Sequence, residues 1–274
     1  FGCSVAISGD TVVVGADSAI SFLSEGSVYI FVRPSGGWSG NLTENVALVA
    51  SDGVLGDTLG WLVGISGNTV VAGATFDDIG SNNDQGSAYV FSLSVWTGRG
   101  ATNNWSDASN WSNSTAPVTQ TDVIFDGASS KATTLDASTT VASINLNSPY
   151  AGTITQGSSN LTVSGDFWQA AGTFTGGAGT LTIGDDFWLS GGTFTAPSGS
   201  MNVAGDWCGW ITPCGGAFNH NNGTVTFNGS AAQPVNIVSS FYNLTINNSA
   251  GVALISDASV NGVLTLSAGD LSIV

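Results

Sequence analysis

A string of 20 residues that recurs in the second half of the chain constrains the fold more than any other feature. Residues 160–179 read NLTVSGDFWQAAGTFTGGAG, residues 180–199 read TLTIGDDFWLSGGTFTAPSG, and residues 200–207 begin a third copy with SMNVAGDW. A fixed period of this length is typical of repeat proteins in which one short unit stacks on the next. Each copy contains short apolar–polar alternations separated by Gly, Ser and Ala, which predict three strands and three turns. The sequence therefore predicts a parallel β-solenoid with one coil per copy.

An apolar–polar–apolar triplet extends this register in both directions. The outer residues of a triplet face one side of a strand and the middle residue faces the other. The triplets begin at Ile144, Leu161, Leu181, Met201, Val225, Leu244 and Leu264. We expect these residues to stack as one inward column, with the middle Thr and Asn residues as an outward polar ladder. Antiparallel hairpins are the alternative, which is disfavoured because the units lack Asn-Gly or Asp-Gly two-residue turns between paired strands.

The charge of the chain excludes several partners. Only three of the 274 residues are Lys or Arg, and the formal net charge is −16. Nucleic acids and anionic membranes are bound through Lys and Arg, so neither is an expected partner. No run of about 18 apolar residues occurs, and we expect no membrane span. The acidic residues are almost all Asp, which suits either the solubility of a secreted protein or calcium-binding loops.

Two cysteines lie in an insertion in the repeat. Cys208 and Cys214 belong to DWCGWITPCGG, in a step between triplets that is four residues longer than its neighbours. We predict a disulfide that pins a bulge at 207–216. A metal site is disfavoured there because His220 is the only other soft ligand. Cys3 is left over, either buried and free or paired with a partner outside this chain.

A second, longer repeat occupies the N-terminal third. Residues 1–16 (FGCSVAISGDTVVVGA) match residues 59–74 (LGWLVGISGNTVVAGA), and GSVYIF at 26–31 matches GSAYVF at 86–91. An all-β unit of roughly 60 residues suits a propeller blade. The combination of FG, SVAISGD, GA and GSxYxF resembles the bacterial FG-GAP repeats, the blade units of integrin-type β-propellers. The chain carries fewer than two such units, so the resemblance implies a partial propeller.

The FG-GAP resemblance also implies a calcium site. In that family, the segment between the GA and the GSxYxF often carries Asp-rich calcium loops, and the matching segment here is 74–86. Its oxygen ligands are Asp77, Asp78, Asn82 and Asp84. An ordinary solvated turn is the alternative for this segment.

A segment without a period of its own joins the two repeats. Residues 96–127 are rich in Asn, Ser, Thr and Trp, and resemble the opening found before the β-helical stalks of bacterial surface proteins and autotransporter-like adhesins. We expect Trp96, Trp105 and Trp111 to cap the first coil, because an open strand edge must be covered. An aromatic carbohydrate platform is the alternative. The stretch 200–274 is similar to the repeats of large secreted bacterial adhesins.

The expected fold is therefore all-β in three parts. FG-GAP-like units occupy 1–95, the connector and cap 96–127, and the β-solenoid 128–274. The chain begins inside a blade motif and ends inside a solenoid unit, so we expect strands at both ends to lack neighbours.

Catalysis is not expected. Asp166, Asp186 and Asp206 form the one regular carboxylate array of the sequence, but equivalent carboxylates made by repetition are a poor acid–base pair. No Arg or Lys lies near them in the repeats, and His220 stands alone in a polar turn. A turn role or a calcium ladder is favoured over a catalytic site.

Three functions from different classes remain. A structural or adhesive extracellular protein at the cell surface is favoured, either as a repeating subunit of a filament or within flanking repeats of a longer chain. A carbohydrate-binding module is second, and a glycan-cleaving enzyme is third.

Overall fold

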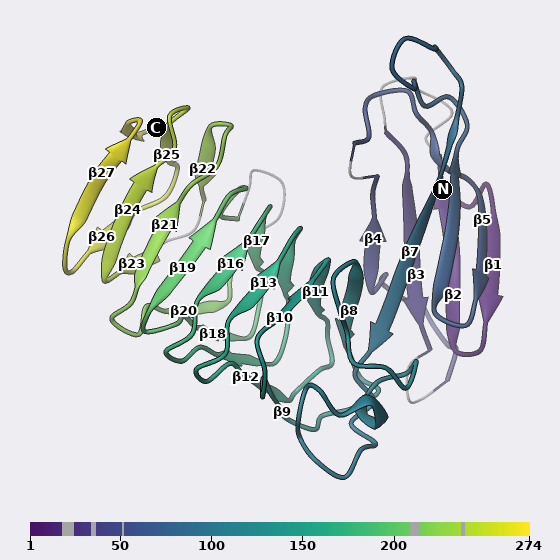
Figure 1. The fold of residues 1–274 in the computed structure, drawn as a ribbon, viewed down its shortest axis with the longest axis horizontal. Coiled ribbons are helices and arrows are strands. Elements are labelled where there is room, and N and C mark those ends of the chain that lie inside the picture. Colours follow the sequence, from purple (N-terminus) through teal and green to yellow (C-terminus); the bar gives the residue numbers. More distant parts are fainter. Residues whose placement is uncertain (18–24, 34–36, 51, 209–213, 237–238) are drawn as a thin grey trace. The chain divides into compact units, whose positions relative to one another are not determined.

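The regular secondary structure of the described residues is almost entirely β-strand, and the chain forms two compact units. The computed structural model describes residues 1–17, 25–33, 37–50, 52–208, 214–236 and 239–274. The units are Phe1–Ser94 and Val95–Val274 (Figure 1). The described residues contain a single short 3-10 helix, η1 (Ala108–Asn110). The expectation of an all-β protein is confirmed.

The first unit holds one antiparallel sheet per repeat. The first sheet comprises β1 (Val5–Ser8), β2 (Thr11–Ala16), β3 (Ser27–Val32) and β4 (Val46–Leu48). The second repeat forms β5 (Leu59–Ser66), β6 (Thr69–Ala74) and β7 (Ser87–Val95). Gly9 and Gly67 begin the two-residue turns of the first hairpins with φ of 57° and 58°, which glycine adopts without strain.

The two sheets of the first unit approach closely at Gly15 and Gly60. A Cβ atom on Gly15 would lie 1.9 Å from the carbonyl oxygen of Gly60, so a side chain has no room there. The Ser4 hydroxyl and the Cys3 thiol both donate to that carbonyl at 3.1 Å. Cys3 is exposed, so the first of the two readings, a buried free thiol, is wrong, and a partner outside this chain stays a prediction.

The second unit is a parallel β-solenoid whose coils have three sides. The first side has seven strands, β10 (Thr139–Val141), β13 (Leu161–Val163), β16 (Leu181–Ile183), β19 (Ser200–Val203), β21 (Thr224–Phe227), β24 (Asn243–Asn247) and β27 (Leu264–Ala268). The second side has β8 (Thr121–Phe125), β11 (Ser143–Leu146), β14 (Phe167–Gln169) and β17 (Phe187–Leu189), and then, beyond a bridge at Trp207, β22 (Gln233–Val235), β25 (Val252–Leu254) and β28 (Leu271–Ile273). The third side has β9 (Thr133–Thr134), β12 (Thr153–Thr155), β15 (Thr173–Thr175), β18 (Thr193–Thr195) and β20 (Ala217–Asn219), followed by the pair β23 (Ser239–Phe241) and β26 (Ala258–Val260).

The predicted inward column is confirmed from Leu161 onward. Each member pairs with the next along the first side, in the order Leu161, Leu181, Met201, Val225, Leu244 and Leu264. The middle residues form the outward polar ladder, as in the pairing of Thr162 with Thr182.

The assignment of Ile144 to this column is wrong. Ile144 lies on the second side, where it pairs with Phe167, and Thr139 pairs with Leu161 instead. The strand on the first side, Thr139–Val141, lacks the apolar–polar–apolar triplet, whereas Ile144–Leu146 carries it on the second side, so the triplet alone does not specify the side. The spacing from Ile144 to Leu161, shorter than the other steps, was the available warning.

The core is a stack of aromatic rings. Phe174 and Phe194 lie parallel with centroids 4.8 Å apart, and Phe187 contacts Phe194 edge-on at 4.8 Å. Such pairs add to the stabilisation that apolar burial provides. Phe187 also packs on Trp207, with centroids 4.5 Å apart, so the stack continues into the next coil.

The three Trp residues of the connector lie in the core above the first coil. Trp96, Trp105 and Trp111 are buried, and all three rings lie within 5.9 Å of Phe125. The backbone of Trp105 donates to Thr134 at 2.8 Å, which covers the edge of β9. Because their rings are buried, these residues are no carbohydrate platform. The first coil itself begins at β8, within the range 96–127.

Candidate functional site

A row of carboxylates follows the corner between the first and second sides of the solenoid. Asp166, Asp186 and Asp206 each directly precede the residue that starts the second side. The backbone N–H of Asp186 donates to Oδ1 of Asp166 at 3.0 Å, and that of Asp206 donates to Oδ1 of Asp186 at 2.6 Å. The carboxylates of Asp166 and Asp186 therefore each join their own coil to the next.

A fourth carboxylate, which the sequence analysis missed, completes a cluster. One oxygen each of Asp166, Asp185 and Asp186 lies within 4.8 Å of the others, and this is the one such acidic group within the described part of the chain. Asp185 replaces the glycine that stands at positions 165 and 205 in the neighbouring copies. That break in the repeat, SGD to GDD to AGD, was the signal that could have revealed it.

The cluster favours protonated carboxyl groups. Burial raises the pKa of Asp166 to about 7, and the charges of Asp185 and Asp186 add to the rise. Burial likewise raises the pKa of Asp186 to about 6, against the lowering effect of the hydrogen bond from Asp206. Asp166 is exposed as a whole residue, but neighbouring atoms surround its carboxyl group. The protonated form of this carboxyl group is therefore substantially populated near neutral pH.

The chemistry open to this cluster is that of hard oxygen ligands. Three carboxylates without a cationic partner suit a cation such as calcium. The basic residues lie elsewhere, since Arg33 pairs with Asp10 and the Lys131 amine donates to backbone carbonyls of Gly100 and Thr102. Asp206, the third member of the expected ladder, is not part of the cluster.

The loop predicted to bind calcium uses its polar groups internally. Oδ1 of Asp78 accepts a hydrogen bond from the backbone of Asp84 at 2.8 Å, and Ile79 pairs with Asn82. Asp77 is buried and lies apart from this exchange, because its carboxylate accepts from the Tyr89 hydroxyl at 3.0 Å.

Tyr89 was not singled out from the sequence, yet two carboxylates meet at its hydroxyl. The second is Asp52, at 2.8 Å. Burial first, and then the two carboxylates, raise the pKa of Tyr89 well above its usual range. The GSxYxF motif was the available signal for this residue.

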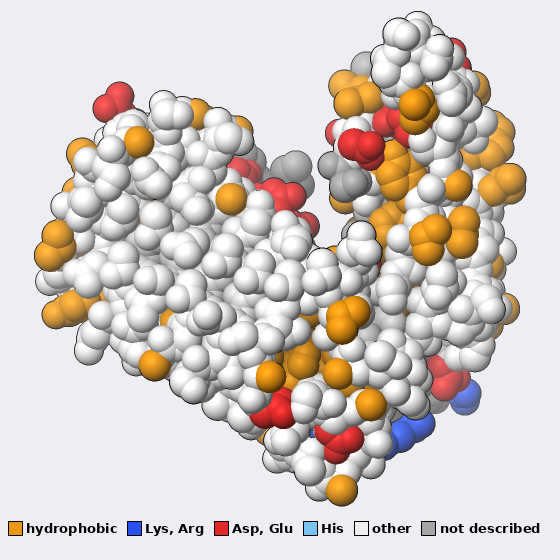
Figure 2. Space-filling view, in the orientation of Figure 1, with side chains coloured by type: hydrophobic (Ala, Val, Ile, Leu, Met, Phe, Trp, Pro, Cys, Tyr) orange, Lys and Arg blue, Asp and Glu red, His pale blue; other side chains and the backbone are white. Residues whose placement is uncertain are grey.

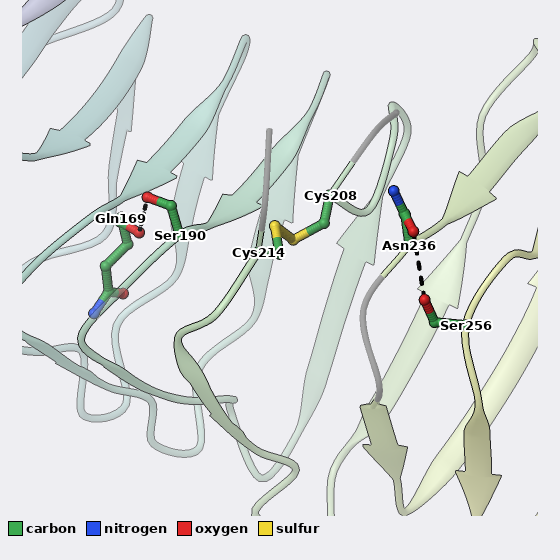
Figure 3. Close-up of a disulfide and its surroundings, with 6 residues drawn as sticks. All are labelled: Gln169, Ser190, Cys208, Cys214, Asn236 and Ser256. Atoms are coloured by element: carbon green, nitrogen blue, oxygen red, sulfur yellow. Dashed lines mark hydrogen bonds between the residues drawn. A yellow bond between two sulfur atoms is a disulfide. The ribbon is translucent and has the colours of Figure 1, made fainter. Parts of the chain in front are cut away.

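The predicted disulfide between Cys208 and Cys214 is confirmed (Figure 3). The Cys208 backbone donates to Phe187 at 2.9 Å and the Gly215 backbone to Leu189 at 3.2 Å, so the insertion leaves and rejoins the stack on the same strand, β17. The residues between, including Trp210 and Pro213 of the predicted bulge at 207–216, lie outside the described residues. His220 lies in a turn, where its Nδ1 accepts from the backbone of Asn222 at 3.0 Å.

Comparison with known families matches the first unit. Residues 1–31 and 42–91 match the model of the FG-GAP repeat. No curated protein and no solved structure matches the chain. No helix in the described part of the chain is long and apolar enough to cross a membrane. FG-GAP repeats beside a β-solenoid indicate a repeat-type surface or adhesion-like protein.

Proposed function

We propose that this chain is an extracellular structural and adhesive protein, and that its solenoid is a stiff element of a surface filament or stalk. The observation that carries the proposal is the use of polar groups to join coils. Asp166 and Asp186, at the corner, link successive coils through their side chains. One oxygen each of Asp166 and Asp186 serves this cohesion between coils, and we infer that the chain is not an enzyme.

Buried glutamines support the same function. The side-chain amide of Gln169 donates to Gly172 in its own coil and to Thr193 in the next, both at 3.1 Å. Gln156 does the same with Ser159 and Thr180, both at 3.0 Å. Hydrogen bonds that span coils from fully buried side chains resist shear between the coils.

The coil of β26, β27 and β28 offers a surface for a further coil. Leu264 is 46% exposed, whereas Leu244, the preceding member of the same inward column, is 1% exposed. An open strand edge next to an apolar surface favours addition of another strand. The proposed occupant is another coil of this kind, from a second copy in a filament or from flanking repeats of a longer chain.

Composition and the disulfide support an extracellular location. Disulfides persist in oxidising compartments, and a net charge of −16 keeps a surface protein soluble.

Light scattering of the purified chain over a range of concentrations tests the filament. We expect growth with concentration, and we expect Leu266→Asp, on β27, to abolish the growth through the solenoid edge. Val118→Asp is the matched control, because Val118 and Leu266 are similarly exposed, at 61% and 57%, and Val118 lies away from that coil. A wild-type chain that stays monomeric at all concentrations would refute the filament. The remaining proposal would then be that the chain is part of a longer adhesin.

Binding of glycans is the second candidate. Trp168 and Trp188 are half-buried, and their rings lie 5.6 Å apart on the outward face of β14 and β17, next to the acidic cluster. Aromatic faces beside hydrogen-bond acceptors are typical of sites that hold sugars. A glycan array run with wild type and Trp188→Ala tests this, and equal signals from both would refute it.

Calcium is the proposed cofactor. The cluster of Asp166, Asp185 and Asp186 offers carboxylate oxygens, and the loop at 77–84 remains the second proposed place. Binding would raise the melting temperature, so melting that is unchanged by excess calcium and by chelator would refute this part of the proposal.

A further inference from the structure

The two FG-GAP repeats leave opposite faces of their sheets open. We call face A the side that carries Val13 and Ile30 in the first repeat, which pair across β2 and β3, and Val71 and Val90 in the second, which pair across β6 and β7. Val13 and Ile30 are fully buried, whereas Val71 is 44% and Val90 is 68% exposed. Face A is therefore covered in the first repeat and open in the second.

Face B, the other side of each sheet, shows the reverse. It carries Ile7 and Val12 in the first repeat and their counterparts Ile65 and Val70 in the second. Val70 is fully buried and Ile65 half-buried, whereas Val12 is half-buried and Ile7 is 63% exposed. Face B is therefore covered in the second repeat, whereas in the first it is open around Ile7 and buried at the end of β2 that carries Val14 and Ala16.

The covered faces meet each other within the chain. Two serine hydroxyls, on β1 and just before it, join the repeats. The hydroxyl of Ser4 donates to the carbonyl of Gly60, on β5, at 3.1 Å. The hydroxyl of Ser8, on face A of β1, accepts from the backbone N–H of Gly67, in the turn after β5, at 3.0 Å. Face A of the first repeat thus packs on face B of the second. The two open surfaces are face A of the second repeat and face B of the first repeat. They are equivalent to the two faces that pack on each other inside the chain.

We propose that face A of the second repeat docks on face B of the first repeat in a second copy of this chain. The contact inside the chain is the template, because it joins the same two faces of equivalent strands. Strands β1–β3 and β5–β7 contain no Asp, Glu, Lys or Arg, so no charge opposes the contact. Figure 2 shows hydrophobic side chains gathered on the visible surface of this unit. The docking differs from the solenoid contact proposed above, since it concerns the first unit alone.

This contact is heterologous, because each copy contributes two different faces. Copies joined in this way close into a ring or continue as a chain, according to the rotation between them. A chain with one face blocked still offers the other face.

The test uses full-length chains that all carry Leu266→Asp, which removes the solenoid contact. In that background we expect assemblies of several copies by native mass spectrometry and light scattering. Val90→Asp blocks face A and Ile7→Asp blocks face B, so each variant alone becomes monomeric. An equimolar mixture of the two forms a heterodimer and nothing larger, because one intact pair of faces remains.

Any of three results would overturn the proposal. The chain with Leu266→Asp could be monomeric, or adding Val90→Asp or Ile7→Asp to it could leave the size of its assemblies unchanged. The equimolar mixture of the two variants could also stay monomeric. Val118→Asp, an exposed valine outside the first unit, is the matched control and keeps the assembly. Circular dichroism checks the fold, and Val90→Ser and Ile7→Ser replace any variant that loses it. Assembly lost with Leu266→Asp alone supports the solenoid contact and rejects the blade contact, so the two proposals fail separately.

Discussion

One position of the solenoid repeat allows a sharp test of the close packing between coils. Gly165, Asp185 and Gly205 occupy equivalent places in three successive copies. A Cβ atom on Gly205 would lie 2.3 Å from Oδ1 of Asp186 and 2.4 Å from the carbonyl carbon of Asp185. On Gly165 the nearest atom, the carbonyl oxygen of Ala142, would be 3.2 Å away. The same substitution should therefore have different effects at the two glycines.

The expected magnitude follows from these distances. Neither glycine has a positive φ, so alanine introduces no backbone strain. Overpacking of a rigid site costs about 1–3 kcal/mol, and displacement of the Asp186 carboxylate also weakens its hydrogen bond from Asp206, worth roughly 1.5–3 kcal/mol. We expect Gly205→Ala to lower the free energy of unfolding by about 3 kcal/mol, which is roughly 6–12 °C in melting temperature. Gly165→Ala should change it by less than about 1 kcal/mol.

Urea unfolding followed by the fluorescence of the nine Trp residues measures both variants. The disulfide stays oxidised, and all chains carry both Leu266→Asp and Val90→Asp, so that neither proposed association contributes to stability. Equal losses in the two variants, or a larger loss for Gly165→Ala, would refute the claim that the Asp185–Asp186 turn leaves no room for a side chain in the next coil.

Three further predictions concern the solenoid. The folded-state pKa of Asp166, about 7, exceeds the unfolded value of 3.8, so the contribution of its protonation to the free energy of unfolding is complete below pH 3.8 and is lost as the pH rises through about 7. Asp166→Asn should therefore flatten the fall of stability between these two pH values in urea unfolding measured at a series of pH values. An unchanged pH profile would contradict this prediction. Replacing Cys208 and Cys214 by Ser should cost about 2 kcal/mol, because the bond closes a loop of few residues, with a sequence separation of 6; differential scanning calorimetry of reduced wild type provides the control. Phe194→Ala, at a fully buried ring, should cost about 3–5 kcal/mol in urea unfolding, and Phe218→Ala, at a partly buried ring of the same ladder, should cost less; an equal cost for both would contradict the burial argument.

Much of the solenoid was predictable from the sequence because its determinants are local. A strand alternates its side chains with a period of two, and a coil returns to the same side after a fixed number of residues. Leu161 and Leu181 were placed in register by these two periods alone. The FG-GAP units and the disulfide followed from short motifs in the same way.

The prediction failed where the local pattern fits two places. Ile144 has the alternation of an inward strand on either side of the coil, and only its pairing with Phe167 decides the side. Trp105 and Trp168 are equally large and aromatic, yet the first is buried in the cap and the second is half-exposed on a flat side. The residue type does not record which surface lies next to it.

The candidate site divides in the same manner. The period predicted that Asp166 and Asp186 would stack, because they occupy one repeat position. Asp185 joins them through the geometry of the turn, and Asp52 meets Tyr89 across a long stretch of sequence. Neither the contact of Asp185 with its neighbours nor that of Asp52 with Tyr89 is indicated by a periodic pattern in the sequence.

By itself, the sequence determined the strand content, the inward alternation, the length of a coil and the strongly negative charge, since each depends on residues within one or two repeats. The tertiary structure alone decided which copies of a motif are covered. Val13 and Val71 stand at the same position of the same repeat, yet one is fully buried and the other is 44% exposed. Burial depends on the surface that lies opposite: face A of the first repeat packs on the second repeat, whereas face A of the second repeat is open.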